Sequence, residues 1–385
     1  MPDRDRGQVP PVSVLVLSFT RTGKDPRVLR QIAALAGSCR LVSMGLGPAP
    51  VGVHAHFELM DRGRTWWQKL CHVWAILAGD AILFAGTSPL VDQAIVQLKD
   101  LRPAVVIAND LDTLWPAITR LGGAAVIFDA HEYYPCEWGA RWWRLTIGRT
   151  RGRLCRRLIP RCRGFTTVCQ GIADRYLRST GCRASVVTNA AEFRHQATRA
   201  TGTTIALVHH GNAERNRRLE LTILAVKGLS QHFTLTFYLV GDPGYVAELK
   251  QLAGNDPRIR FRDPVPYAEI LPTLSEFDVG VFLLPPSTIN YFHALPNKFF
   301  EFIQARLAVA IGPSPEMARE VHRWGIGWVA DDFSPEGLRS ILAQLTPESV
   351  DRAKGAAAAA ARLLSSESGS TAIRDCVSRA LATVR

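Results

Sequence analysis

The sequence has few cysteines, and they lack the spacings typical of metal ligands. Eight cysteines are spread over 385 residues. No C-x-x-C pair occurs, and no histidine follows at a zinc-like distance. We therefore expect no metal site and no disulfide framework, but free thiols in a reducing cytoplasm.

Long apolar runs are also missing. The segment 73–86 is apolar, but Asp80 interrupts it and it is shorter than the roughly 20 residues that span a bilayer. Residues 1–11 contain no apolar core of a signal peptide. These absences predict a cytoplasmic protein without a transmembrane helix.

Acidic residues are scarce relative to basic ones: Lys and Arg number 46 against 34 Asp and Glu, which gives a net charge of +12. The excess favours anionic partners. It is concentrated in 138–163, which holds nine arginines, no acid, and Trp138, Trp142 and Trp143. This pattern fits either a peripheral segment on the inner face of an anionic membrane or a solvated helix between strands. No nucleic-acid module accompanies it, so we expect no nucleic-acid partner.

The length and the alternation of elements predict two α/β domains. A chain of 385 residues exceeds one ordinary core, and strand-like runs alternate with helical ones, as in parallel sheets. One of the expected helices covers 66–86. The expected organisation is a first domain over 1–195, a polar linker over 196–204, a second domain over 205–350 and terminal helices over 351–385.

The segment 290–302, N-Y-F-H-A-L-P-N-K-F-F-E-F, carries the clearest binding pattern. A helix is expected to open at Pro296, with Asn297 and Lys298 at its start and Glu301 one turn further on. Free amides at a helix N-terminus and a lysine suit a phosphate, and a carboxylate can accept both hydroxyls of a ribose. The pattern indicates a nucleotide sugar or dinucleotide. A capped helix with solvated side chains is the alternative.

A second phosphate-binding pattern lies at the start of the second domain. A strand leads into Gly211, and Arg215, Arg217 and Arg218 precede a helix expected near Leu219. The glycine would let the backbone approach a pyrophosphate, and the cations would bind it. Surface charge without a ligand is the alternative.

In the first domain, polar residues follow two apolar strands. Asp110 and Asp112 come after one strand, and Asp129, His131 and Glu132 come after the next. Ligands of open α/β sheets lie at the carboxyl ends of strands, so these side chains are candidate site residues. The D-x-D pair would bind a metal in the unrelated GT-A fold, whereas helix capping by Asp112 is the simpler interpretation.

An earlier helix is predicted from D-P-R-V. Asp25 is expected as the N-cap and Pro26 as the first helical residue. Arg27 then faces either a ligand or solvent.

Four short segments of the sequence resemble motifs of retaining glycosyltransferases of family 4, which have the GT-B fold. They are P-N-K-F-F-E, D-A-H-E-Y-Y-P, D-P-R-V and F-T-T-V-C-Q-G-I-A-D-R-Y. The resemblance implies two Rossmann-like domains with parallel sheets facing across a cleft, and a final helix that returns to the first domain. It also implies metal-independent transfer of a sugar, with retention, from a nucleoside-diphosphate sugar to an acceptor hydroxyl.

The resemblance also assigns roles on the donor side. Glu301 would hold the ribose, Arg217 or Arg218 would bind the diphosphate with Lys298, and backbone near Val265 would contact the base. Catalysis is assigned to Arg217, Lys298 and His131. Arg217 and Lys298 would stabilise the departing diphosphate.

On the acceptor side, His131 would lie near the reacting centre. Arg27, Asp110, Asp129 and Glu132 would line the cleft. The acid that many relatives carry eight positions before Glu301 is replaced by His293. This departure keeps a non-catalytic partner protein open as an alternative, alongside a nucleotide-sugar 2-epimerase of the same fold.

Overall fold

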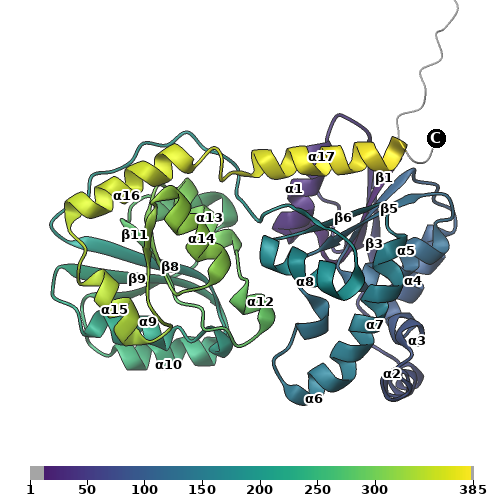
Figure 1. The fold of residues 1–385 in the computed structure, drawn as a ribbon, viewed down its shortest axis with the longest axis horizontal. Coiled ribbons are helices and arrows are strands. Elements are labelled where there is room, and N and C mark those ends of the chain that lie inside the picture. Colours follow the sequence, from purple (N-terminus) through teal and green to yellow (C-terminus); the bar gives the residue numbers. More distant parts are fainter. Residues whose placement is uncertain (1–12, 383–385) are drawn as a thin grey trace, which may run out of the picture. The chain divides into compact units, whose positions relative to one another are not determined.

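A computed structural model describes residues 13–382, which form two compact units (Figure 1). The first unit contains residues 13–187 and 369–382, and the second contains residues 188–368. The expectation of a missing signal peptide concerns residues 1–11, which lie outside the described part of the chain. No helix among the described residues is both long and apolar enough to cross a bilayer.

The first unit is built on a parallel sheet of seven strands in the order β3-β2-β1-β4-β5-β6-β7. Its strands are β1 (Ser13–Arg21), β2 (Arg40–Leu46), β3 (Ala55–Leu59), β4 (Val105–Asn109), β5 (Ala125–Ala130), β6 (Gly164–Thr167) and β7 (Ser185–Val186). Central strands covered on both faces need apolar side chains throughout. The run Val14 to Leu17 in β1 is accordingly without solvent exposure.

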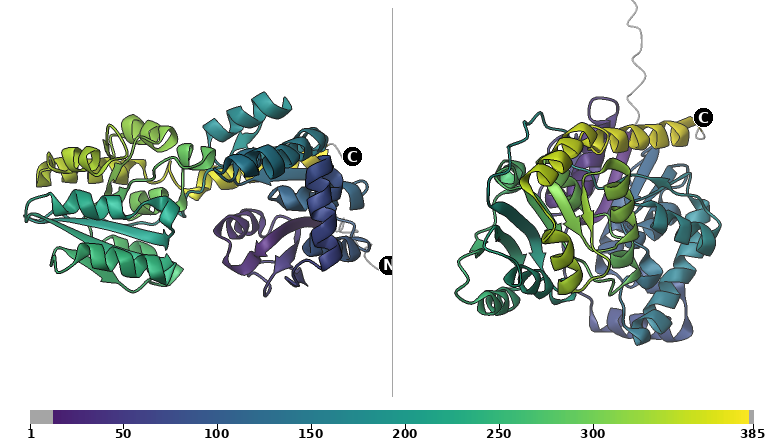
Figure 2. Two further views of the ribbon diagram at one scale, coloured as in Figure 1. Left: turned by 90° about the horizontal axis from the view of Figure 1, so that it is seen from below. Right: turned by 60° about the vertical axis from the view of Figure 1, so that its left-hand side comes forward.

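The helices of the first unit cover both faces of this sheet (Figure 2). They are α1 (Pro26–Leu35), α2 (Trp66–Ala78), α3 (Ala81–Gly86), α4 (Pro89–Leu98), α5 (Leu111–Arg120), α6 (Arg141–Trp143), α7 (Arg149–Leu158), α8 (Gln170–Thr180) and α17 (Ser366–Ala382). The predicted start of α1 is confirmed, because the Asp25 carboxylate accepts hydrogen bonds from the amides of Arg27 and Val28 and Pro26 follows it.

The single helix expected over 66–86 is wrong, since the structure has two. Gly79 ends α2 in the left-handed conformation at φ +68°. Asp80 then caps α3 by accepting from the amides of Ile82 and Leu83. The aspartate that interrupts the apolar run is therefore a helix cap.

The second unit has a six-stranded parallel sheet in the order β10-β9-β8-β11-β12-β13. Its strands are β8 (Ile205–Ala213), β9 (Phe233–Gly241), β10 (Ile259–Arg262), β11 (Val279–Phe282), β12 (Ala308–Ile311) and β13 (Gly327–Val329). Its helices are α9 (Glu220–Lys227), α10 (Pro243–Ala253), α11 (Ile270–Leu274), α12 (Ile289–Phe292), α13 (Asn297–Gln304), α14 (Pro315–Trp324), α15 (Pro335–Leu342) and α16 (Pro347–Ala360).

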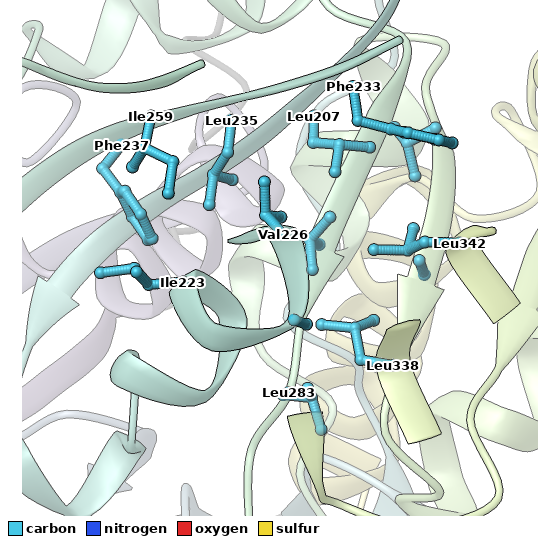
Figure 3. Close-up of a cluster of buried hydrophobic side chains, with 14 of the residues drawn as sticks. Leu207, Ile223, Val226, Phe233, Leu235, Phe237, Ile259, Leu283, Leu338 and Leu342 are labelled. Carbon is cyan, nitrogen blue, oxygen red and sulfur yellow. The ribbon is translucent and has the colours of Figure 1, made fainter. Parts of the chain in front are cut away.

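The core of the second unit joins the sheet to its helices. Figure 3 shows Leu207, Leu235 and Phe237 from the strands facing Ile223 and Leu338 from α9 and α15. Burial of these aliphatic and aromatic side chains is the main stabilising contribution. It fixes the strand ends on which the candidate site is built.

The units divide at different points from those expected. Residues 196–204, expected as a linker, belong to the second unit, where the amide and hydroxyl of Thr201 donate to Asp351. The helix α16 is part of the same unit, and the chain leaves it only after residue 368. The final helix, α17, adds Ile373 and Val377 to the core of the first unit.

Candidate functional site

In the second unit, the carboxyl end of β8 lies against the start of α13. Pro296 is the N-cap of α13 and Asn297 is its first residue, which places Lys298 and Glu301 on its first two turns. Both side chains are 6% exposed. They are therefore not the solvated pair of the alternative interpretation.

Lys298 is a buried lysine that lies beside two aromatic side chains. Its Nζ lies 3.5 Å from Nε2 of His209 and 4.5 Å from the ring centroid of Phe282. Burial, followed by the positive charge of Arg217, lowers the pKa of Lys298 to about 7, although Glu301 and Glu214 oppose the shift. A phosphate would supply the negative charge that this ammonium group needs.

Gly211 is required by the position of that lysine. Its φ is +112°, where a side chain is strained. A Cβ added to Gly211 would lie 3.1 Å from Nζ of Lys298 and 3.3 Å from its Cε. The absence of a side chain lets the Lys298 ammonium lie against the backbone of β8.

The three arginines that follow β8 are not equivalent. Arg217 is 23% exposed, and its charge is the one that acts on Lys298. Arg218 has φ +54° and its side chain donates to Glu220. Arg215 pairs with Glu248 at 2.5 Å on the surface. The sequence left Arg217 and Arg218 as equal candidates, whereas the geometry favours Arg217.

Glu301 faces a second histidine of β8. Its Oε2 lies 3.3 Å from Nε2 of His210, and both side chains are buried. Burial, followed by the charge of Lys298, lowers the pKa of His210 to about 3, so this imidazole is neutral at pH 7. A neutral His210 therefore places no positive charge against the Glu301 carboxylate.

A small cavity of about 110 Å³ adjoins this cluster. Its lining is mostly apolar and includes Gly211, Tyr238 and Val265. An aromatic ring and aliphatic walls suit a flat ring better than a charged group. The full lining is His210, Gly211, Tyr238, Val240, Pro264, Val265, Ile270, Thr273 and Leu274.

His293 lies beside a carboxylate from another element. Its Nδ1 is 3.5 Å from Oε1 of Glu316, in the first turn of α14. Arg319 donates to the other oxygen of Glu316 at 2.8 Å. The Glu316 side chain is 3% exposed, so a buried carboxylate lies next to His293.

In the first unit, a polar network joins the carboxyl ends of the central strands. Arg27 donates two hydrogen bonds of 2.6 Å to Asp129. Gln31 donates to Asp129 at 2.6 Å and to Asn109 at 2.8 Å. Although burial opposes it, the Arg27 charge keeps the pKa of Asp129 well below its usual range. Arg27 is therefore a buried partner of Asp129 and does not face solvent.

His131 lies between two carboxylates of this network. Its Nδ1 is 3.2 Å from Asp110 and its Nε2 is 3.4 Å from Asp129. Burial lowers the pKa of His131, but the two carboxylates outweigh burial and raise it. The imidazole thus favours the protonated form and can donate from both nitrogens.

The D-x-D pair does not act as a unit. Asp110 accepts from the Tyr134 hydroxyl, and Asp112 pairs with Arg151 at 3.4 Å. The expected capping by Asp112 is wrong: Asp110 holds the N-cap position of α5, with φ +67°, and Asp112 lies inside the helix. Burial raises the pKa of Asp110. Within residues 13–382, no group of three or more His, Cys, Asp or Glu is arranged to hold a metal ion.

Glu132 is an acid of the first unit with a raised pKa. Desolvation, then the carboxylates of Glu137 and Asp110, raise its pKa to about 7. Because the residue is exposed to solvent, screening moderates the shift. Glu132 can exchange a proton near neutral pH, which makes it a candidate acid or base.

Some residues of both clusters were missed at the level of sequence. In the second unit these are His209 and His210 of β8, which lie beside Lys298 and Glu301. In the first unit they are Gln31, Asn109 and Tyr134, which complete the polar network. The histidine pair directly before Gly211 was a visible signal. Gln31 gave none, because a glutamine within an amphipathic helix looks like a surface residue.

No protein-family model matches the sequence, and no curated protein matches it. Solved structures do match. HepE of Anabaena in complex with UDP and glucose is 12% identical with a TM-score of 0.68, covering 95% of this chain and 99% of HepE. The sucrose-phosphate synthase of Thermosynechococcus elongatus is 12% identical with a TM-score of 0.74, covering 97% and 100%.

A putative UDP-N-acetylglucosamine 2-epimerase of Listeria monocytogenes is also similar, at 10% identity and a TM-score of 0.59, covering 95% of this chain and 96% of that protein. At such low identity these matches establish fold alone. Together with the two parallel α/β sheets, they confirm the predicted fold: the chain has the GT-B fold.

Proposed function

We propose that the protein is a family 4 glycosyltransferase that moves a sugar from a nucleoside-diphosphate sugar to an acceptor hydroxyl with retention of configuration. One observation carries this proposal. A buried lysine, an arginine, a strand glycine and a buried glutamate gather beside a small apolar cavity in the second unit. The similarity to HepE, whose structure contains UDP and glucose, supports the same ligand class.

Each part of such a donor has a partner in this cluster. Lys298 and Arg217 bind the diphosphate near Asn297 at the start of α13, because cations and the positive end of a helix dipole favour phosphate charge. Glu301 accepts the ribose hydroxyls. The base enters the cavity beside Gly211 and Val265.

The proposed chemistry is a displacement at the anomeric carbon. The bond from that carbon to the phosphate oxygen breaks, and the acceptor oxygen forms the new bond on the same face. The acceptor proton passes to the departing diphosphate. Lys298 and Arg217 stabilise the charge that develops on this leaving group, so the proposal requires no divalent metal.

Two further residues serve the acceptor in the first unit. His131, held by Asp110 and Asp129, donates hydrogen bonds near the reacting centre. Arg27 fixes Asp129 and thereby acts through His131. Glycan, lipid-linked and small natural-product acceptors all offer the hydroxyl that this chemistry needs.

The test compares Glu301→Ala and Arg217→Ala with Arg218→Ala. Loss of one charge-assisted hydrogen bond costs about 1.5–3 kcal/mol, so the first two variants should bind the donor about 10- to 150-fold more weakly. Arg218→Ala, a matched change at an exposed arginine paired with Glu220, should bind normally. Equal binding by all three variants contradicts the proposal. Transfer that is lost in EDTA contradicts metal independence.

The donor is identified by thermal shift against UDP, GDP, ADP and dTDP sugars. A ligand present at 100 times its dissociation constant stabilises the folded protein by about 2.7 kcal/mol. We expect one base to raise the melting temperature and the others to leave it unchanged. The absence of any shift at millimolar sugar nucleotide argues against a donor site.

A nucleotide-sugar 2-epimerase is the second candidate function. It is favoured by two acids of the first unit, Glu132 and Asp110, whose pKa values are raised as acid–base chemistry requires. Incubation with donor alone distinguishes the two functions. An epimerised nucleotide sugar formed without acceptor favours the epimerase, and transfer that needs an acceptor favours the glycosyltransferase.

A further inference from the structure

One end of the first unit exposes an unusual number of large apolar side chains. Five of the nine tryptophans of the chain are at least 60% exposed, and all five lie on α2 or in 138–142. Exposed aliphatic side chains continue both stretches. The set is Trp66, Trp67, Leu70, Val73, Trp74 and Leu77 on α2, with Trp138, Trp142 and Leu145 on the second stretch.

The two stretches form one surface although about 60 residues separate them in sequence. The helix α2 contacts the π-helical turn Arg144–Gly148, which joins α6 to α7. Arg153 of α7 donates to the carbonyl of Gly79 at the end of α2, at 3.1 Å. Figure 1 shows α2 and α6 at the same end of the first unit. We call these nine side chains, together with the helical segment 141–156, the aromatic-basic face.

A basic hollow of about 600 Å³ lies within this face. Five arginines line it and no acid does. They are Arg141, Arg144, Arg149, Arg153 and Arg156. Gly148 and Gly152 follow one another on the same side of the helix, and a Cβ on Gly148 would lie 2.6 Å from the Pro135 carbonyl. These glycines let the helix lie against the 135–136 loop, which together with the arginines encloses the hollow.

The charges of this hollow are not neutralised within the unit. Among the described residues, no ion pair involves Arg141, Arg144, Arg149 or Arg156. Arg151, by contrast, pairs with Asp112 and Glu137 and is buried. Arginines held around a hollow without carboxylates attract an anion with several oxygen acceptors, such as a phosphate group.

We propose that the aromatic-basic face docks onto the surface of an anionic phospholipid bilayer. The indoles of α2 and 138–142 would enter the interfacial layer, where an apolar ring with one polar N–H is favoured. Leu70, Leu77 and Leu145 would reach the acyl boundary, and the arginine hollow would take lipid phosphate groups.

Charge and side-chain type argue against two other occupants. A second copy of the chain meeting this face through a two-fold axis would oppose unneutralised arginines to arginines. A nucleic acid would use the arginines but leave the exposed leucines and valine of α2 in contact with phosphate and water. A bilayer with anionic head groups satisfies both kinds of side chain.

Docking is measured by sedimentation of the full-length protein with vesicles of phosphatidylcholine alone and with 30% phosphatidylglycerol. The proposal goes beyond the glycosyl-transfer function, and its readout is independent of sugar donor, acceptor and turnover. We expect binding to the anionic vesicles, a blue shift of tryptophan emission, and weaker binding at high salt.

Two variants separate the apolar and basic contributions. Trp74→Glu with Leu77→Glu, at positions 61% and 79% exposed, should abolish binding at every salt concentration. Arg144→Gln with Arg149→Gln and Arg156→Gln should weaken binding to anionic vesicles about 100-fold, at roughly 1 kcal/mol per arginine. Because all these positions are on the surface, the variants should melt like the wild type.

The controls carry substitutions of the same kind at exposed positions elsewhere on the protein. Val96→Glu alters an exposed valine of α4. Arg178→Gln with Arg183→Gln and Arg260→Gln removes three exposed charges. Both controls should bind vesicles normally. The proposal is overturned if the wild type does not bind anionic vesicles, or if the face variants bind like the controls. It is also overturned if the protein dimerises through this face instead, so that dimerisation depends on concentration and is lost in the Trp74 variant.

Discussion

Lys298 of the proposed donor site is expected to change its protonation when a ligand binds. The side chain is buried beside His209 and Phe282 with its pKa lowered to about 7. Because the unfolded chain keeps this proton up to about pH 10.4, the free protein gains stability from this group as the pH rises above 7. A bound diphosphate reverses the preference, since its negative charge favours the ammonium form.

Donor binding is therefore expected to take up a proton. The affinity for UDP-glucose, or for the sugar nucleotide that the screen identifies, should fall by up to about tenfold per pH unit above pH 7. Calorimetry at pH 8.5 in buffers of different ionisation enthalpy measures the uptake directly. Lys298→Met should bind weakly with little dependence on pH. A flat affinity profile in the wild type would show that Lys298 does not meet the diphosphate.

The pair of His293 and Glu316 gives a second prediction at this scale. His293→Glu places two carboxylates together at a site where Glu316 is 3% exposed. We expect a loss of about 1–3 kcal/mol in stability at pH 7. One carboxyl of such a pair has a raised pKa, so the loss should shrink as the pH falls toward 5. Thermal unfolding against pH measures it.

The control for this substitution is the double variant His293→Glu with Glu316→Gln. It keeps one carboxylate at the site and should regain most of the lost stability. Equal melting temperatures for the single and double variants would mean that the two side chains do not interact.

At the scale of elements, one buried ion pair attaches α16 to the sheet of the second unit. Lys354 of α16 lies 3.0 Å from Asp278, which directly precedes β11, and the two side chains are 2% and 1% exposed. The other Asp278 oxygen accepts from the amide of Ala206 in β8. The carboxylate thus joins a helix to two neighbouring strands.

Removing the lysine alone leaves a buried carboxylate without its main partner. Lys354→Met should cost about 3–5 kcal/mol in the free energy of unfolding of the second unit. Arg199→Met is the matched control, because Arg199 lies 3.4 Å from the same carboxylate but is 54% exposed. It should cost less than about 1 kcal/mol. Urea unfolding followed by circular dichroism measures both, and similar losses would contradict this account.

At the scale of the whole molecule, the chain ends in the unit where it begins. The helix α17 follows the second unit in sequence, but Ile373, Cys376 and Val377 belong to the core of the first. Arg374 also donates to the carbonyl of Ala34 at the end of α1. The stability of the first unit consequently depends on residues more than 180 positions beyond its last strand.

Val377→Asp tests this dependence, because it places a charge where the side chain is 5% exposed. Hydrogen exchange should show a loss of protection in the first unit, with destabilisation of at least about 3 kcal/mol. Donor-induced protection in the second unit should persist. Ser378→Asp, on the exposed side of α17, is the control and should change neither unit. Loss of protection confined to the second unit would contradict the assignment.

Local patterns in the sequence determined much of the fold. The apolar runs of β1, β4, β5, β8 and β11 were recognisable as strands because a buried parallel strand needs apolar residues on both faces. Asp25 and Pro26 marked the start of α1 because a cap uses only neighbouring atoms. The strands β2, β3 and β13 were not predicted. They lie toward the sheet edges or carry polar residues, so their strand conformation depends on pairing: β2 pairs with β1, β3 with β2 and β13 with β12.

The parallel α/β class, the two sheets, and the residue types that suit a diphosphate and a ribose could all be read from the order of residues in the chain. Which of these residues meet became clear only from the three-dimensional arrangement. Arg218 pairs with Glu220, whereas Arg217 acts on Lys298. Glu316 lies beside His293, and α2 contacts the turn Arg144–Gly148. The physical reason is that a strand or a cap is set by neighbours in the chain, whereas burial and charge pairing depend on side chains that packing brings together from distant positions.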